Sequence, residues 1–320
     1  MRVLVTGGAG FIGSHVCDAL LARGDTVVCL DNFDAYYSPA RKRRNIASAL
    51  RSPAFHLWEG DIRDADTVRA LFEQERPEKV VHIAAMAGVR YSLAHAQLFQ
   101  EVNVGGTVIL LEAARHFGVR AFLLASSSSV YGASSRPPFR EDDPCVHPIS
   151  PYAATKRAAE LLTYTYHHLY SLPCTVLRFF TVYGPRGRPD MAPYRFTDAI
   201  FRGRPLHLYG DGSAQRDFTY IDDIVAGVLA ALDAELPWEI INLGNSRTVT
   251  VREFIALIER IVGRRAQIVQ DSPAPGDVPL THADIAKARR LLGFEPRTGL
   301  EAGMERFFHW YRAEEATGEP

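Results

Sequence analysis

Short apolar runs rich in β-branched residues alternate with helical patterns through the first 180 residues of the chain. A short apolar run bounded by turn residues is typical of a buried strand, and apolar residues three and four apart indicate a helix. The predicted strands cover 3–5, 27–30, 55–58, 79–85, 121–125 and 175–180, and the predicted helices reach from Gly13 to Leu21 and cover 67–74, 103–117 and 152–170. This alternation predicts an α/β fold with a doubly wound parallel sheet, whose ligands bind at the carboxyl ends of the strands.

The regular alternation ends near residue 181. Proline and glycine become dense over 181–189, and arginines stand at positions 186, 188, 195, 202 and 204. We expect residues 1–180 to form a dinucleotide-binding domain, with 217–245 returning to it, and 181–216 and 246–320 to form a smaller, interleaved substrate lobe. Helical patterns near 251–262, 284–292 and 300–310 fall in or beside that lobe.

The composition argues against several classes of protein. Of the 320 residues, 47% are hydrophobic and 23% are charged, as in ordinary globular enzymes. The formal net charge of −1 shows no excess of positive charge of the kind that binds DNA or RNA. No apolar run approaches membrane-spanning length, and neither C-x-x-C spacing nor a disulfide framework links Cys17, Cys29, Cys145 and Cys174. We therefore expect a cytoplasmic protein with no nucleic-acid or membrane partner.

A glycine-rich turn joins the first predicted strand to the first helix. Gly8, Gly10 and Gly13 have G-x-G-x-x-G spacing, which lets the backbone turn tightly and approach a pyrophosphate at the N-terminus of a helix. The second strand ends in Asp31, which is placed to accept hydrogen bonds from the hydroxyls of an adenosine ribose. Because a carboxylate would repel a 2′-phosphate, this acid favours NAD over NADP.

A second constellation begins at Ser150, a good N-cap followed by proline at the first helical position. Tyr152 and Lys156 then lie at i and i+4 on one face of the predicted helix. A cation near a phenol lowers its pKa, so the tyrosine could act as a general base near neutrality. The cluster 126–129 delivers serine hydroxyls to the same edge of the sheet. No metal site is predicted, because the pair His167-His168 has no third ligand nearby.

These motifs, in this order, are those of a known family. With Gly7-x-x-Gly10-x-x-Gly13, Asp31, the serine cluster before Val130-Tyr131-Gly132, and Tyr152-x-x-x-Lys156, the chain resembles the extended short-chain dehydrogenase/reductase family of nucleotide-sugar enzymes. The resemblance covers nearly the whole length and implies a Rossmann-type sheet. Residues 32–37, 87–92 and 184–191 look like the UDP-glucuronate 4-epimerases, and the chain is similar to the UDP-galactose 4-epimerases at greater distance.

The resemblance implies a retained NAD that removes hydride from C4 of a UDP-sugar while Tyr152 takes the hydroxyl proton. The 4-keto ring then turns over and accepts the hydride on its other face, which would convert UDP-glucuronate reversibly to UDP-galacturonate. Lys156 would hold the nicotinamide ribose and Ser127 would hydrogen-bond the reacting oxygen. The resemblance also suggests a homodimer through the helices at 103–117 and 152–170.

The resemblance further implies two sets of binding residues. The cofactor would contact Gly7, Gly10, Phe11, Ile12, Gly13, Asp31, Asn32, Asp61, Ile62, Ala84, Ala85, Asn103, Ser126, Tyr152, Lys156 and Phe180. The substrate would contact Arg90, Ser127, Ser128, Ser129, Thr181, Arg188, Gln215 and Arg216, of which Arg216 resembles the diphosphate-binding arginine of the family. Ala274 stands where galactose-type enzymes usually carry a second arginine for the diphosphate.

Four alternatives to glucuronate epimerisation stay open at the level of the sequence. A UDP-glucuronate decarboxylase begins with the same oxidation, and a UDP-glucose or UDP-N-acetylglucosamine 4-epimerase uses the same machinery on a neutral sugar. A sugar 4,6-dehydratase is disfavoured, because the positions where it needs an acid and a base hold Ser128 and Ser129. A non-catalytic NAD-binding regulator is also disfavoured, because such proteins generally lose the tyrosine or the lysine.

Arg188 is predicted to favour epimerisation over decarboxylation. Oxidation at C4 of a glucuronate places a ketone β to the C6 carboxylate, and such an acid loses carbon dioxide once its C5–C6 bond stands perpendicular to the carbonyl plane. A guanidinium can bind a carboxylate bidentately and fix its orientation, and hydroxyls from Ser127, Ser128 and Thr181 could add directional hydrogen bonds.

Overall fold

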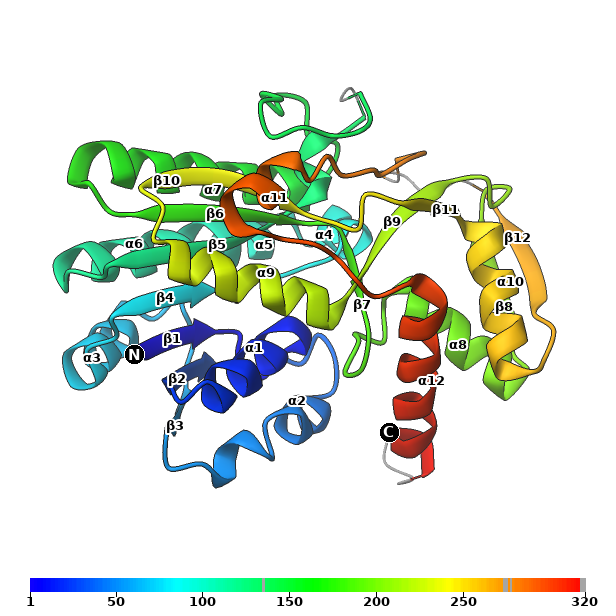
Figure 1. The fold of residues 1–320 in the computed structure, drawn as a ribbon, viewed down its shortest axis with the longest axis horizontal. Coiled ribbons are helices and arrows are strands. Elements are labelled where there is room, and N and C mark those ends of the chain that lie inside the picture. Colours follow the sequence, from blue (N-terminus) through cyan, green and yellow to red (C-terminus); the bar gives the residue numbers. More distant parts are fainter. Residues whose placement is uncertain (134–135, 273–275, 277, 317–320) are drawn as a thin grey trace.

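The larger part of the protein is a seven-stranded sheet, seen in a computed structural model that describes residues 1–133, 136–272, 276 and 278–316 (Figure 1). Its strands are all parallel and follow the order β10-β6-β5-β4-β1-β2-β3. Their bounds are β1 Arg2–Thr6, β2 Thr26–Asp31, β3 Phe55–Glu59, β4 Lys79–His82, β5 Ala121–Ser127, β6 Cys174–Phe179 and β10 Trp238–Leu243. The predicted doubly wound α/β fold is confirmed.

Both faces of this sheet are buried by helices. Successive side chains of a strand point to opposite faces, so β1 buries Val3 and Val5 in one apolar cluster and Leu4 in the other. The first cluster includes residues of α1 (Phe11–Ala22) and α9 (Ile221–Ala234), which pack against each other. The second includes residues of α3 (Ala65–Glu75), α6 (Thr107–His116) and α7 (Pro151–Tyr170). Burial on both faces explains why the strands are apolar runs.

A smaller group of elements lies beyond the carboxyl ends of the large sheet (Figure 1). It contains a three-stranded sheet of β7 (Thr181–Tyr183), β9 (Gln215–Tyr220) and β11 (Thr248–Thr250), and a parallel pair of β8 (Pro205–Tyr209) and β12 (Gln267–Asp271). The helices α8 (Ala192–Arg202), α10 (Val251–Val262) and α12 (Leu300–Ala316) accompany them. A capping box at Thr250 and Glu253 starts α10, since each side chain accepts the other residue's backbone N–H.

The proposed division into two lobes is not the same as a division into two sheets. The chain returns to the large sheet through α9, which starts at Ile221, because β9 pairs with β7 and β11. α11 (Ala286–Leu292) also packs on α9 and β10, although the proposal assigns it to the smaller lobe. The boundaries of the lobes remain a proposal.

Several local expectations need correction. β4 ends at His82 and not at residue 85, because the N–H groups of Ile83 and Ala84 both donate to the carbonyl of Thr6 and turn the chain. The expected loop 86–92 contains the start of α4 (Val89–Ala94), which is followed by α5 (Ala96–Gln100). The helix expected from residue 103 begins with a π-helical segment, Glu101–Gly106.

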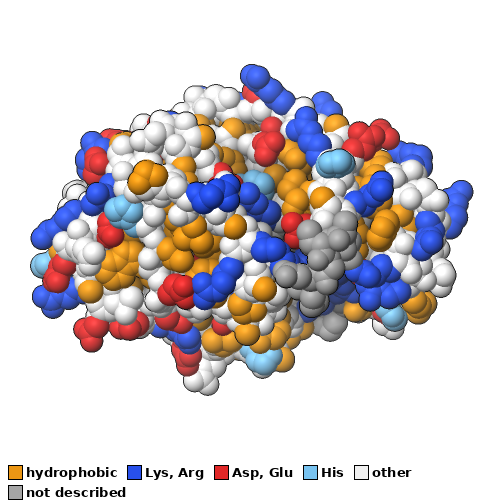
Figure 2. Space-filling model, turned by 90° about the horizontal axis from the view of Figure 1, so that it is seen from below, with side chains coloured by type: hydrophobic (Ala, Val, Ile, Leu, Met, Phe, Trp, Pro, Cys, Tyr) orange, Lys and Arg blue, Asp and Glu red, His pale blue; other side chains and the backbone are white. Residues whose placement is uncertain are grey.

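The remaining short helices are α2 (Pro39–Asn45) and the 3₁₀ turns Ala49–Arg51 and Ser128–Tyr131. Over the described part of the chain, no helix is long and apolar enough to cross a membrane. Basic and acidic side chains are both spread over the face shown in Figure 2, with apolar side chains between them.

Candidate active site

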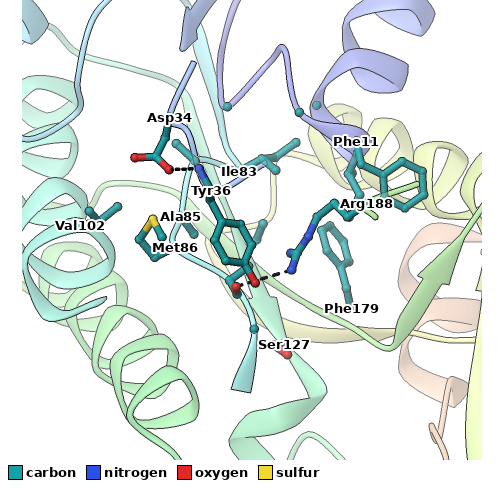
Figure 3. Close-up of a pocket in the computed structure, with 18 of the residues that line it drawn as sticks. Phe11, Asp34, Tyr36, Ile83, Ala85, Met86, Val102, Ser127, Phe179 and Arg188 are labelled. Atoms are coloured by element: carbon teal, nitrogen blue, oxygen red, sulfur yellow. Dashed lines mark hydrogen bonds between the residues drawn. The ribbon is translucent and has the colours of Figure 1, made fainter. Parts of the chain in front are cut away.

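A cavity of about 360 Å³ opens at the carboxyl ends of the large sheet, where the sequence places its ligand (Figure 3). Twenty of the predicted site residues line it, from both the large sheet and the smaller group of elements. They are Gly7, Gly10, Phe11, Ile12, Gly13, Asp31, Asn32, Asp61, Ile62, Ala84, Ala85, Ser126, Ser127, Ser128, Ser129, Tyr152, Lys156, Phe180, Thr181 and Arg188. Segments that are far apart in the sequence therefore meet at one site.

The glycine turn is packed too tightly for any side chain. Gly7 has a φ of +69°, and a Cβ there would lie 2.8 Å from the backbone of Ala84. A Cβ at Gly13 would lie 2.1 Å from the carbonyl oxygen of Gly7. Since the turn carries no side chains at these positions, the N-terminal end of α1 can approach an anionic group in the cavity directly.

Asp31 closes the adjacent side of the cavity at the end of β2. Its carboxylate accepts the N–H of Ala9 at 3.0 Å and that of Phe33 at 2.8 Å, so its position is fixed. Burial raises its pKa, against the lowering effect of those two hydrogen bonds and of the nearby Lys42. Each carboxylate oxygen retains a second lone pair that could accept a ribose hydroxyl. Asp61, held by Arg63 and Asn32, lines the same region with a pKa lowered to about 2.

Tyr152, Lys156 and Ser127 meet on the opposite side of the cavity. The N-cap Ser150 accepts the N–H of Ala153 and Pro151 occupies the first turn, so α7 starts where the sequence predicts. Lys156 donates to the carbonyl oxygen of Ala125 at 2.8 Å, which ties α7 to the end of β5. Burial lowers the pKa of Lys156 to about 8, and it therefore carries its charge at neutral pH.

The protonation of Tyr152 differs from the sequence-based expectation. We expected the pKa of its phenol to be lowered by Lys156, but burial raises it, because removal from water disfavours the phenolate. A hydrogen bond with Ser127 and the positive charge of Arg188 oppose this rise. Lys156, whose ammonium group donates to the carbonyl of Ala125, does not contribute to this opposition.

Arg188 enters the cavity from the loop between β7 and α8. Its Nε and Nη2 donate to the carboxylate of Asp190, the former at 2.9 Å, and Nη2 also lies 3.5 Å from the carbonyl oxygen of Ala87. The Tyr36 hydroxyl donates to Asp190 at 3.0 Å, and the guanidinium lies over the Tyr36 ring (Figure 3). One edge of the guanidinium is therefore already bound by a carboxylate of the chain itself, a pairing that the sequence analysis did not anticipate.

Four predicted binding residues lie outside the lining of the cavity. Asn103 is buried behind it, where its amide bonds the N–H and carbonyl of Met86 and the hydroxyl of Thr155. Arg90 is exposed, and its guanidinium lies 3.9 Å from the centre of the Tyr209 ring. Gln215 accepts a hydrogen bond from Thr248, while Arg216 donates to the carbonyl of Gln215. Their roles stay predictions, and Ala274 lies outside the described residues.

Sequence reasoning also missed residues that line the cavity. Tyr36, Gly88 and Met191 belong to the three stretches by which the chain resembles the glucuronate epimerases, so the stretches themselves were the available signal, and Met86 directly precedes the second of them. Gly88 has a φ of +113°, and a Cβ there would lie 3.0 Å from the Tyr36 hydroxyl. The glycine therefore leaves room for the side chains that converge on Arg188.

The described residues fit a dinucleotide. The glycine turn lies at the N-terminal end of α1, Asp31 lies at the end of the neighbouring strand β2, and the buried Lys156 lies on the far side of the same cavity. These are the groups that a pyrophosphate, an adenosine ribose and a nicotinamide ribose require. No group of three or more His, Cys, Asp or Glu residues that could hold a metal ion occurs in the part of the chain that the structure describes.

Comparison with known proteins places the chain among nucleotide-sugar enzymes. The family model described as GDP-mannose 4,6 dehydratase matches residues 4–307. UDP-glucuronate 4-epimerase 1 of Arabidopsis thaliana is 46% identical over 97% of this chain and 76% of that protein, and the UDP-glucuronate 4-epimerase of Thermodesulfobacterium geofontis is 44% identical over 96% and 95%. The crystal structure of UDP-glucuronic acid 4-epimerase from Bacillus cereus with UDP-glucuronic acid and NAD is 38% identical, with a TM-score of 0.93 over 98% of this chain and all of that one.

The extent of these matches agrees with the order of the motifs and with the cavity where they meet. The matched segment includes the glycine turn, the serine cluster, and Tyr152 with Lys156. The chain belongs to the NAD-dependent epimerase/dehydratase family, the extended branch of the short-chain dehydrogenases/reductases.

Proposed function

We propose that this protein is a UDP-glucuronate 4-epimerase that converts UDP-glucuronate reversibly to UDP-galacturonate with a retained NAD. The observation that carries the proposal is the convergence of Tyr152, Ser127 and Arg188 on one cavity that also fits a dinucleotide. The relatives support it, because two proteins matched over nearly the whole chain are UDP-glucuronate 4-epimerases, and the Bacillus cereus structure contains UDP-glucuronic acid and NAD.

The residues of the cavity would divide the reaction between them. Bound NAD supplies reversible hydride transfer at C4 of the sugar. Tyr152 takes the proton of the C4 hydroxyl and returns it, and Ser127, hydrogen-bonded to Tyr152, orients the reacting oxygen. Lys156, charged at neutral pH, holds the nicotinamide ribose. Asp31 accepts hydrogen bonds from the adenosine ribose, which favours NAD over NADP.

The C6 carboxylate would be held by Arg188 together with the hydroxyls of Ser127, Ser128 and Thr181, all of which line the cavity. Ser128 and Ser129 have no useful pKa near neutrality, so neither can serve as the acid or base that elimination of water requires. This chemistry supports epimerisation over dehydration, although the matching family model is named after a dehydratase. Arg90, Gln215 and Arg216 remain proposed contacts of the rest of the nucleotide.

We also propose that the protein is a cytoplasmic homodimer. α7 exposes four large apolar side chains, namely Leu161, Tyr164, Leu169 and Tyr170. Pairing of α6 and α7 with the same helices of a second copy would cover part of this apolar surface. All four cysteines are free and buried, which suits a reducing compartment.

The direct test of the function is to incubate the purified protein separately with UDP-glucuronate, UDP-glucose and UDP-N-acetylglucosamine, without added nicotinamide cofactor, and to identify products by NMR. We expect UDP-galacturonate from the first sugar and little product from the other two. A UDP-pentose with carbon dioxide would indicate a decarboxylase, and equal turnover of a neutral sugar would remove the carboxylate from the recognition. Bound NAD without turnover of any sugar would contradict catalysis.

A further inference from the structure

A buried ion pair lies directly behind the catalytic residues. Glu160 on α7 and Arg178 on β6 are both completely buried. Arg178 donates its Nε to Glu160 Oε1 at 2.9 Å and its Nη2 to Oε2 at 2.8 Å, a bidentate arrangement. Arg157 donates to Oε2 at 2.9 Å from the same helix. The carboxylate thus fixes α7 relative to β6.

The same carboxylate also reaches β5. The hydroxyl of Ser126 donates to Glu160 Oε1 at 2.6 Å, so the side chain of Ser126 is directed away from the cavity. Ser126 lies between Ala125, whose carbonyl oxygen accepts the Lys156 ammonium, and Ser127, which is hydrogen-bonded to Tyr152. Glu160 therefore holds the residue that connects the anchor of the lysine to the partner of the tyrosine.

Glu160 is also one helical turn after Lys156, on the same face of α7. A buried ammonium needs a nearby negative charge to remain protonated, since burial favours the neutral amine. The charge of Glu160 raises the pKa of Lys156 and so opposes the effect of burial. The carboxylate thus acts on the lysine through its charge and on the serines through a hydrogen bond.

We propose that Glu160 is a positioning residue for catalysis: through Ser126 it sets the place of Ser127, and from one helical turn away it holds a carboxylate beside Lys156. The proposal deepens the proposed function and rests on it. It gives the buried pair a chemical role, whereas a buried ion pair is by itself weak evidence for stability. Neither Glu160 nor Arg178 lines the cavity, so neither touches the substrate in this arrangement.

Two substitutions separate the two effects. In Glu160→Gln an amide NH₂ group replaces one carboxylate oxygen. Each of the two oxygens accepts two hydrogen bonds, so in either orientation of the amide its NH₂ group points at two N–H or O–H donors. This variant loses the charge and disturbs the hydrogen bonds. Ser126→Ala removes only the hydroxyl and leaves the pair of Glu160 with Arg178 intact. It is therefore the milder variant and the one more certain to fold.

Each variant has a matched control. Glu75→Gln changes another buried carboxylate that accepts hydrogen bonds from His56 and Trp58, far from the cavity. Thr163→Val removes a buried hydroxyl of α7 that donates to the carbonyl of Glu160 and has no bond to the serine segment. Each control variant loses a buried polar group of the same kind as its test variant, but that group has no proposed connection to the active site.

The measurements are kcat and KM for UDP-glucuronate over pH 6–10, and the affinity for NAD over the same range by calorimetry on cofactor-stripped protein. We expect Ser126→Ala to lower kcat about tenfold or more with KM nearly unchanged, as for an interaction that positions a transition state. In Glu160→Gln the loss of kcat and of NAD affinity at alkaline pH should begin at lower pH than in the wild type, because Lys156 loses its proton earlier. Ser126→Ala should leave that alkaline limit where it is.

Three results would overturn the proposal. The first is a folded Glu160→Gln variant with wild-type kcat and an unshifted alkaline limit. The second, decisive if Glu160→Gln does not fold, is wild-type kcat in Ser126→Ala. The third is an equal loss of kcat in Ser126→Ala and Thr163→Val, which would indicate a general effect on stability. If the wild type turned over no UDP-sugar, the proposed function would fail, and the NAD affinities would still test the link between Glu160 and Lys156.

Discussion

Replacement of Arg188 by alanine should weaken the binding of UDP-glucuronate by roughly 10- to 150-fold. The guanidinium reaches the cavity with its Nε and Nη2 already bound to Asp190, so mainly Nη1 is left for the C6 carboxylate. One hydrogen bond to a charged group contributes about 1.5–3 kcal/mol, and each 1.4 kcal/mol corresponds to a tenfold change in affinity. If the guanidinium were free to bind the carboxylate bidentately, the expected loss of affinity would be larger.

The pairing with Asp190 complicates this single substitution. Without Arg188, the carboxylate of Asp190 would keep the hydroxyl of Tyr36 as a partner but would lose its counter-ion, and it would repel the substrate carboxylate. The double variant Arg188→Ala with Asp190→Asn removes this repulsion. If the affinity recovers in part, the difference between the single and double variants measures the repulsion, and the remaining deficit measures the lost attraction.

Binding should be measured by calorimetry in a Tyr152→Phe background loaded with NAD, where turnover does not interfere. UDP-glucose, which has no C6 carboxylate, is the control ligand and should bind both proteins nearly equally. Products should be analysed by NMR in the Arg188→Ala variant that retains Tyr152. Part of the sugar should appear as carbon dioxide and a 4-keto pentose nucleotide, with absorbance growing at the NADH band. Unchanged affinity for UDP-glucuronate together with clean conversion to UDP-galacturonate would refute the role of Arg188.

Three further predictions concern the reaction and the assembly. Tyr152→Phe should retain its fold and its NAD but lose at least roughly a hundredfold in kcat, the usual contribution of a positioned base, and near-wild-type turnover would remove Tyr152 from the mechanism. Purified protein should turn over UDP-glucuronate with bound NAD that is not consumed, and a continuous requirement for NADPH would contradict both the epimerase and the role of Asp31. Leu161→Glu, a change at an exposed apolar residue of α7, should halve the mass in solution measured by light scattering, and an unchanged mass would place the dimer interface elsewhere.

The parts of the fold that depend on local sequence could be predicted. The strands β1, β2, β5 and β6 are buried on both faces and have apolar runs at their centres, and α7 carries its own start signal at Ser150, whereas β10 was not among the predicted strands. The glycine turn, Asp31 and the start of α7 at Ser150 need only neighbouring residues to be recognised. The cavity could be placed for the same reason, because the topology fixes where parallel strands end.

The parts that depend on distant partners could not be predicted. Asn103 is expected at the cofactor, but its amide bonds Met86 and Thr155 behind the cavity, so its role there stays a prediction. Ser126 is also expected at the cofactor and lines the cavity, but its hydroxyl donates to Glu160, which is 34 residues later in the chain. Nothing in the residues around either position indicates in which direction a polar side chain points, because that depends on the partner that packing brings close.

The protonation of Tyr152 shows how such partners decide the chemistry. The spacing of Tyr152 and Lys156 alone suggests a phenol whose pKa is lowered by its neighbour, but burial keeps the phenol protonated and the lysine is engaged with Ala125. The charge of Arg188 opposes this effect, and Arg188 comes from another part of the chain. The oxidised nicotinamide ring is a cation and the reduced ring is neutral, so the phenol favours loss of its proton before hydride transfer and retention afterwards. A buried tyrosine whose protonation follows the charge of the nicotinamide ring is therefore suited to a reaction that must run in both directions.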